Sequence, residues 1–333
     1  MKTALLAIIL FCVMIFPHEL GHFIAAKKMG ILVKEFAFGM GPAIWKKQGK
    51  ETLYSIRLLP IGGFCSMEGE DTDSESPRAF NNKKPWQKLI VLAAGSFMNV
   101  LCALLIMILV MGISGFTTTT IDQVDPGSPA EIAELMEGDV VTKIDDFQIE
   151  NWNDVSTAFG AAQGAESTVV VKRDGELKSI DVVPKLNEDG RYVVGITCKV
   201  SHNPITAIVE GSKATFNMTI NLFITIGQLF TGGLGVDDLS GPVGMVQMVD
   251  QTATLGLWYY GFLISMICMN LAIINMLPLP ALDGGRTVLI LAEMITRKKL
   301  PANVEATINA VGLAVLLGLS AIIMIKDVIG LFN

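Results

Sequence analysis

Long apolar stretches alternate with polar ones along this chain of 333 residues. Four stretches, at roughly 3–26, 88–114, 256–277 and 305–330, are long and apolar enough to predict membrane-spanning helices, since about 20 apolar residues cross the hydrocarbon core of a bilayer. The first is too long for a cleaved signal peptide, so it is expected to remain in the mature protein. The pattern predicts a polytopic α-helical membrane protein with about four transmembrane helices.

Residues 120–200 show a different pattern, in which short alternating apolar and polar runs are separated by turn residues. The run NWNDVSTAFGAA predicts a helix, and Asp174-Gly175 marks a hairpin between two alternating strands. Nothing in this stretch is apolar enough to span a membrane. It is therefore expected to form a compact domain of short strands.

Residues 205–231 place apolar side chains at helical intervals among Thr, Asn and Gln. This predicts an amphipathic helix lying in the membrane interface, although 214–230 could also be counted as a further span. A further span would move one of two basic loops to the other side of the membrane, which favours the interfacial interpretation.

Loop charge predicts the orientation, because loops rich in Lys and Arg stay in the cytoplasm. Residues 27–88 hold eleven basic and seven acidic residues, and the loop at 278–304 holds four further basic residues. In contrast, 115–255 holds eight basic and twenty acidic residues. The two basic loops are therefore expected in the cytoplasm, with the long acidic stretch and both termini outside.

Composition supports a membrane protein and excludes other classes. The chain is 51% hydrophobic and 17% charged, with a mean hydropathy of +0.52. Its net charge of -7, without a long basic run, argues against a nucleic-acid partner. The five cysteines include no CxxC pair, and Cys12, Cys102 and Cys268 lie in apolar stretches, which argues against a disulfide framework or a cysteine zinc site.

The candidate chemistry lies in the sequence His18-Glu19-Leu20-Gly21-His22, inside the first apolar stretch. Residues four apart share one face of a helix, so both imidazoles can bind one zinc ion while Glu19 meets a water molecule. The alternative is a pair of ordinary core histidines. Ionisable groups at bilayer depth are costly and normally line a functional site, so the motif favours a metal centre.

A catalytic zinc ion commonly has three protein ligands, and the remaining histidine, His202, lies in the acidic outer stretch. Asp283, in the segment LPLPALDGG, is the best candidate for the third ligand. It follows the third apolar stretch at a cytoplasmic loop, so it is expected at the membrane depth of His22. Its alternative role is a helix N-cap before the apolar run 287–295, and the two roles are compatible.

Together these motifs resemble the site-2 protease family of intramembrane zinc metalloproteases, most closely the bacterial RseP/RasP type with a single PDZ domain. The resemblance covers nearly the whole chain, through HELGH, FGMGP at 38–42, LPIGGF at 59–64, AAGSFMN at 93–99, GPVG at 241–244 and LDGG. Ser96 departs from the family, which often has proline after Ala-Gly. The resemblance implies one Zn²⁺ ion with metal ligands His18, His22 and Asp283, and Glu19 as the catalytic residue that activates water.

The resemblance also implies a domain organisation. Residues 1–114 would hold two transmembrane helices, the HExxH motif and a cytoplasmic membrane-associated β region. Residues 115–203 would form an inserted, extracytoplasmic PDZ-like α+β domain, 204–255 the amphipathic helix and the GPVG segment, and 256–333 the last two transmembrane helices with LDGG. The protein would be a multi-pass protein of the bacterial cell membrane, with its active site near the cytoplasmic side.

The substrate contacts stay open at this point. The LPIGGF segment is either a hairpin against the membrane or, by resemblance, an edge where Gly62, Gly63 and Phe64 bind an extended substrate. Asn275, in an apolar helix, either bonds a neighbouring helix or binds substrate backbone. By resemblance, the partners are the lipid bilayer and single-span membrane substrates, such as trimmed anti-sigma factors or remnant signal peptides.

Two other functions compete with proteolysis. An ion-path transporter explains polar residues in the spans, but neither the HExxH order nor the lack of an inverted sequence repeat. A catalytically inactive PDZ-type membrane scaffold is the other alternative. Against it, all four catalytic positions of the resembled family are filled here.

Overall fold

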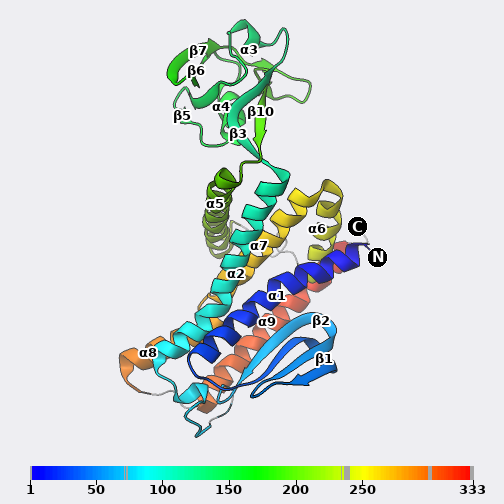
Figure 1. The fold of residues 1–333 in the computed structure, drawn as a ribbon, viewed down its shortest axis with the longest axis vertical. Helices are drawn as coiled ribbons and strands as arrows, with labels where there is room; N and C mark the ends of the chain where they lie inside the picture. Colours follow the sequence, from blue (N-terminus) through cyan, green and yellow to red (C-terminus); the bar gives the residue numbers. More distant parts are fainter. Residues whose placement is uncertain are drawn as a thin grey trace. The chain divides into compact units, whose positions relative to one another are not determined.

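The computed structural model describes residues 2–70, 72, 74–233, 235, 241–298 and 302–330. The chain divides into two compact units. The helical unit comprises Met1–Val110 and Gly211–Asn333, and the inserted unit comprises Met111–Glu210. Figure 1 shows the ribbon with both units.

Four helices of the described chain are long and apolar enough to cross a membrane, judged by length and composition. They are α1 (Lys2–Lys28), α2 (Pro85–Ser114), α7 (Leu257–Asn275) and α9 (Ala302–Gly330). The four helices expected from the apolar stretches are therefore confirmed.

The first two helices pack against each other through glycine. A Cβ atom on Gly21 of α1 would lie 2.2 Å from the carbonyl oxygen of Ala94 on α2, so no larger residue fits at this crossing. On the other side of α2, Ser265 of α7 donates a hydrogen bond of 2.9 Å to the carbonyl oxygen of Ala103. Through these contacts, α2 packs closely against both α1 and α7.

A long antiparallel hairpin, β1 (Val33–Gln48) and β2 (Leu53–Met67), lies alongside α1 (Figure 1). Its register shifts repeatedly, and Gly62 adopts a φ of +90°, which gives the bend expected at LPIGGF. Beyond the bend, Cys65 and Met67 are buried in a core with residues from α1, α2 and helix α8 (Asp283–Thr296). This core fixes the last residues of β2 beside the C-terminal end of α1.

The polar helix expected near 205–231 is present as α5 (Pro204–Thr231). Among the described helices it does not qualify as a span by length and composition. It packs on the helical unit through Gly211, whose Cβ would meet Ile108, and through a contact of 3.6 Å from the Thr219 hydroxyl to the sulfur of Met269. Whether it lies in the interface stays a prediction.

The GPVG segment begins α6 (Pro242–Leu255). Its amides are satisfied from another helix, because the Asp327 carboxylate of α9 accepts hydrogen bonds from the backbone N–H groups of Gly241 at 2.8 Å and Gly244 at 2.9 Å. A carboxylate at a helix N-terminus is favoured by the exposed amides and by the helix dipole. This contact joins α9 to α6.

The inserted unit is a small α+β domain, as the alternating pattern predicts. Its main sheet has the strand order β10-β3-β4-β6-β7, with β5 paired to β4. The strands and helices of the unit are β3 (Phe116–Val124), α3 (Pro129–Ile132), β4 (Val140–Ile144), β5 (Phe147–Gln148), α4 (Trp152–Ala162), β6 (Ser167–Arg173), β7 (Glu176–Val182), β8 (Lys185–Leu186), β9 (Tyr192–Val193) and β10 (Ile196–Ser201).

Local sequence explains two features of this unit. Asn151 and Asp154 form a reciprocal capping box at the start of α4, which satisfies amides that a helix start leaves free. Asp174 and Gly175 both have positive φ and join β6 to β7, which confirms the predicted hairpin. The helices cover a core built from alternate residues of the strands, including Ile121, Val141 and Val169.

Candidate metal centre

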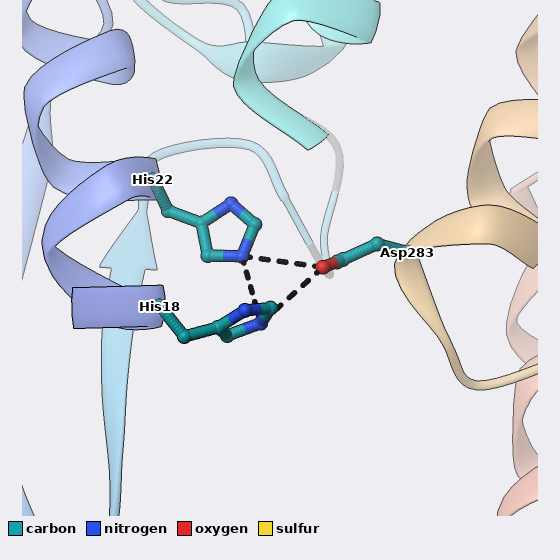
Figure 2. A group of neighbouring side chains, drawn as sticks. All are labelled: His18, His22 and Asp283. Carbon is teal, nitrogen blue, oxygen red and sulfur yellow. Dashed lines mark hydrogen bonds and ion pairs between the residues drawn. The ribbon is translucent and has the colours of Figure 1, made fainter. Parts of the chain in front are cut away.

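Two histidines on one face of α1 and one aspartate from a distant segment converge in the helical unit. The Nε2 atoms of His18 and His22 are 3.2 Å apart. The Oδ2 atom of Asp283 lies 3.4 Å from Nε2 of His18 and 3.3 Å from Nε2 of His22. Figure 2 shows both imidazoles projecting from α1 towards this carboxylate, which comes from the start of α8 (Asp283–Thr296).

These spacings fit a zinc ion. Zinc binds nitrogen and oxygen ligands at about 2.0 Å in a tetrahedral arrangement, which separates the ligand atoms by about 3.3 Å. The three donor atoms here are 3.2 to 3.4 Å apart. The Oδ2 atom of Asp283 is also buried without a hydrogen-bond partner, and a cation between the three atoms would satisfy it.

The Nδ1 atom of His22 contacts the backbone of α2 and fixes the orientation of the ring. This atom lies 2.8 Å from the carbonyl oxygen of Val91 on α2. A carbonyl can only accept, so Nδ1 carries the proton and Nε2 turns its lone pair to the centre. Gly95, one turn further along α2, leaves the space that the rings occupy, since its Cβ would lie 2.4 Å from Nε2 of His22 and 2.7 Å from Cε1 of His18.

Asp283 is the first residue of α8 and does not cap it. Leu282 holds the N-cap position, without a side-chain hydrogen bond, so the N-cap alternative for Asp283 is not what the structure contains. Burial favours a raised pKa for the Asp283 carboxyl, but the neighbouring imidazoles of His18 and His22 outweigh it and hold that pKa well below its usual range. The direction of this shift agrees with the ionised carboxylate, which is the form that binds a metal.

Three contacts hold the start of α8 in place. Gly284 packs so closely on the preceding turn that its Cβ would lie 2.2 Å from the carbonyl oxygen of Leu277. The backbone N–H of Ala281, a residue with positive φ, donates to Asn309 of α9 at 3.3 Å. One turn after Asp283, Arg286 forms an ion pair of 2.7 Å with Glu70, which follows β2.

Glu19 lies beside the three donor atoms in a cavity of about 420 Å³. Cys65 of β2 lines the same cavity. Gly63 lies beside the glutamate, because a Cβ there would be 3.4 Å from Cγ of Glu19, an ordinary contact distance. The cavity is lined by His18, Glu19, His22, Phe64, Cys65, Ser66, Met67, Glu70, Leu92, Asp283 and Arg286.

The residues singled out as substrate contacts divide into two groups. Asn275 is at the centre, with its Nδ2 atom 3.2 Å from Nε2 of His18, and Phe64 lines the cavity beneath the guanidinium of Arg57. Gly63 contacts Glu19, as described above. Gly62 lies apart, since its nearest side-chain neighbour is Met40 of β1 and it does not line the cavity.

Sequence reasoning missed the residues that hold the centre together. The ion pair between Arg286 and Glu70 joins residues 216 positions apart and lines both the cavity of Glu19 and a second cavity of about 260 Å³. Gly95 lies in the AAGSFMN motif, but its contact with two histidines on another helix has no local signal. Only the packing of the helices reveals these roles.

Comparison with known proteins gives a consistent result over nearly the whole chain. The model of peptidase family M50 matches residues 6–319. A Clostridium perfringens protein named "Putative zinc metalloprotease" is 40% identical over 332 residues, which cover 97% of each chain. A Clostridium acetobutylicum protein with the same description is 36% identical over 329 residues, covering 97% of this chain and 96% of its own.

One solved structure resembles a smaller part of the chain. The PDZ domain of an SdrC-like protein from Listeria monocytogenes matches 25% of this chain and 88% of its own, with 19% identity and a TM-score of 0.23.

The geometry predicts that the purified protein holds about one zinc ion per chain. Replacing His18, His22 or Asp283 by alanine should lower the zinc content at least tenfold, because each substitution removes one of three donor atoms. Metal analysis of the detergent-purified variants measures this. His202→Ala is the matched control and should keep its zinc, and a variant of His18, His22 or Asp283 with full zinc and full activity would show that its residue is not a ligand.

Proposed function

The chain belongs to peptidase family M50, the site-2 proteases, and we propose that His18, His22 and Asp283 hold its zinc ion while Glu19 acts as general base. The protein is a zinc metalloprotease of the intramembrane type. The observation that carries the residue assignment is the spacing of 3.2 to 3.4 Å among three donor atoms from two distant segments. Neither a transporter nor an inactive scaffold would require three metal-ligating atoms at this spacing beside Glu19.

Glu19 is the proposed proton-transfer group, because it lines the cavity of the three donor atoms. When bound, a zinc ion polarises a peptide carbonyl and makes water in the site more acidic. The Glu19 carboxylate accepts a proton from the attacking water and returns it to the leaving amine. Glu19 lines the same cavity as His18, His22 and Asp283, which supports this role.

Substrate would bind along the end of β2, where Phe64 to Met67 form one wall of the cavity. A helical substrate hides its carbonyl groups in its own hydrogen bonds, so the segment to be cut must first unwind. Addition as an extended strand beside β2 would hold it unwound. Asn275, beside His18, could then donate to a substrate carbonyl. Helix-breaking residues near the cut should therefore favour cleavage.

The substrates would be single-span membrane proteins, with trimmed anti-sigma factors and remnant signal peptides as the leading classes. The protein is a membrane protein by family and by its apolar helices. Loop charge supports an orientation in the bacterial cell membrane with 27–88 and 278–304 in the cytoplasm, which puts the metal centre near the cytoplasmic face.

The inserted unit would restrict access as a PDZ-like domain. It is acidic and would lie outside the cell by charge. Within the described residues, the cluster of metal-ligating side chains draws nothing from 111–210. A substrate with a large folded ectodomain should collide with such a domain, whereas a trimmed one should pass.

The first prediction from the proposed function concerns the general base. Glu19→Gln should lower the cleavage rate by at least a factor of about 100, because an amide cannot take the proton from water, and it should leave the zinc content near one per chain. Cleavage of a single-span substrate in proteoliposomes and metal analysis measure the two effects. Wild-type cleavage by the glutamine variant would rule out Glu19 as the base.

The second prediction concerns orientation. Single cysteines introduced at positions 47 and 298 should react with a membrane-impermeant maleimide only after the cells are opened, whereas one at position 189 should react in intact cells. The parent is a variant lacking the five native cysteines that still inserts in the membrane. Labelling of position 47 in intact cells would reverse the proposed orientation.

The third prediction concerns the inserted unit. Deletion of 115–203 should leave cleavage of a trimmed substrate intact and permit some cleavage of the same substrate with its ectodomain. Both substrates are compared with the intact enzyme and with a deletion variant that still binds zinc. Loss of activity on both substrates would indicate recruitment or folding instead of restriction.

A further inference from the structure

Pro17 leaves one backbone carbonyl of α1 without its helical partner. The helix runs unbroken from Lys2 to Lys28 with Pro17 inside it. Proline has no N–H, so the carbonyl of Val13, four residues earlier, lacks the donor that the helical pattern normally supplies. In the apolar interior of a membrane such a group must find another partner.

Two thiols from two other helices meet this carbonyl. The sulfur of Cys102 on α2 lies 4.0 Å from the oxygen of Val13, and the sulfur of Cys268 on α7 lies 3.8 Å from it. Because thiols are weak donors, two of them at one oxygen are a reasonable replacement for one lost amide. Three helices therefore meet at the gap in the hydrogen bonding of α1.

This contact is the middle one of three polar contacts between α7 and α1. Towards the N-terminal ends of both helices, the Tyr260 hydroxyl donates to the carbonyl of Leu6 at 2.7 Å. Towards their C-terminal ends, Asn275 contacts Nε2 of His18 at 3.2 Å. Residue numbers increase in the same direction along both helices from one contact to the next. Helix α7 therefore runs parallel to α1 and contacts it at three levels. The middle level is the one at which α1 lacks its own hydrogen bond.

We propose that Cys102 and Cys268 are positioning residues for the metal centre, because they complete the hydrogen bonding of α1 across Pro17. His18 directly follows Pro17, whereas Asp283 approaches from another helix. The spacing of 3.4 Å between them therefore depends on the course of α1 at this point. The inference rests on the proposed zinc ligands. The sequence shows only that these two cysteines lie in apolar stretches and argues against disulfide bonds. Their proposed role comes from the tertiary contacts.

The test replaces both thiols by valine, which keeps their size and removes the donors. The Cys102→Val/Cys268→Val variant should lose zinc to a chelator about tenfold faster than the wild type, as expected for residues that orient a ligand. The absorption spectrum of the cobalt-substituted protein should also change, since it reports ligand geometry without any catalysis. The corresponding serine pair retains donors and should keep more zinc than the valine pair.

A proline variant separates hydrogen bonding from simple packing. In Pro17→Leu, residue 17 has an N–H that can bond the Val13 carbonyl, so the thiols are no longer needed. Adding the valine pair to Pro17→Leu should therefore cause no further loss of zinc. Pro17→Ala serves in the same way if the leucine itself lowers zinc retention.

Two matched controls complete the experiment. Tyr260→Phe removes a hydrogen bond to an α1 carbonyl far from the proline, and Cys12→Val removes a thiol from α1 itself. Both should retain zinc at the wild-type rate. The proposal is overturned if the valine pair keeps wild-type zinc retention and cobalt spectrum, if the serine pair is no better, or if the loss is equal with and without Pro17.

The wild-type zinc content keeps the two proposals apart. A wild type without zinc contradicts the proposed ligands, whereas a zinc-loaded wild type with an indifferent valine pair contradicts only the role of the thiols.

Discussion

The convergence of His18, His22 and Asp283 is the interaction on which the rest of the helical unit depends. Three polar atoms lie 3.2 to 3.4 Å apart among apolar helices, where an unpaired carboxylate is costly. A cation bound there, as proposed, would remove that cost and tie α1 to α8. The proposed centre would thus be both the reactive part of the molecule and a link between segments that are distant in the sequence.

Close backbone contacts make this convergence possible. Gly21 allows α1 and α2 to touch, and Gly95 leaves the volume that the two imidazoles fill. Gly284 lets the start of α8 fold back on its preceding turn, and Arg286 joins that start to the end of β2 through Glu70. These contacts position α1, α2, α8 and the end of β2, whose residues line the cavity that Glu19 and Asp283 share.

A second theme is the satisfaction of backbone groups by side chains from neighbouring helices. Asp327 takes the first amides of α6, Ser265 bonds a carbonyl of α2, and Tyr260 bonds a carbonyl of α1. The thiols at the Val13 carbonyl belong to the same pattern. In a membrane, where water cannot replace these partners, such contacts fix the relative positions of helices more firmly than apolar packing alone.

The sequence by itself determined whatever depends on near neighbours along the chain. Residues 18 and 22 share a helix face because of the 3.6-residue period of the helix. The length and apolar composition of four segments predict the four long helices, and Asp174-Gly175 specifies its hairpin. Only the tertiary structure brought Asp283 to the two histidines, placed Asn275 against His18, and separated Gly62 from the cavity. The same holds for Arg286 with Glu70 and for the two thiols at Val13, since these partners lie 89 to 255 positions apart in the sequence. Helical period and turn chemistry act over a few residues, whereas these pairings arise from how whole helices pack, which no local pattern encodes.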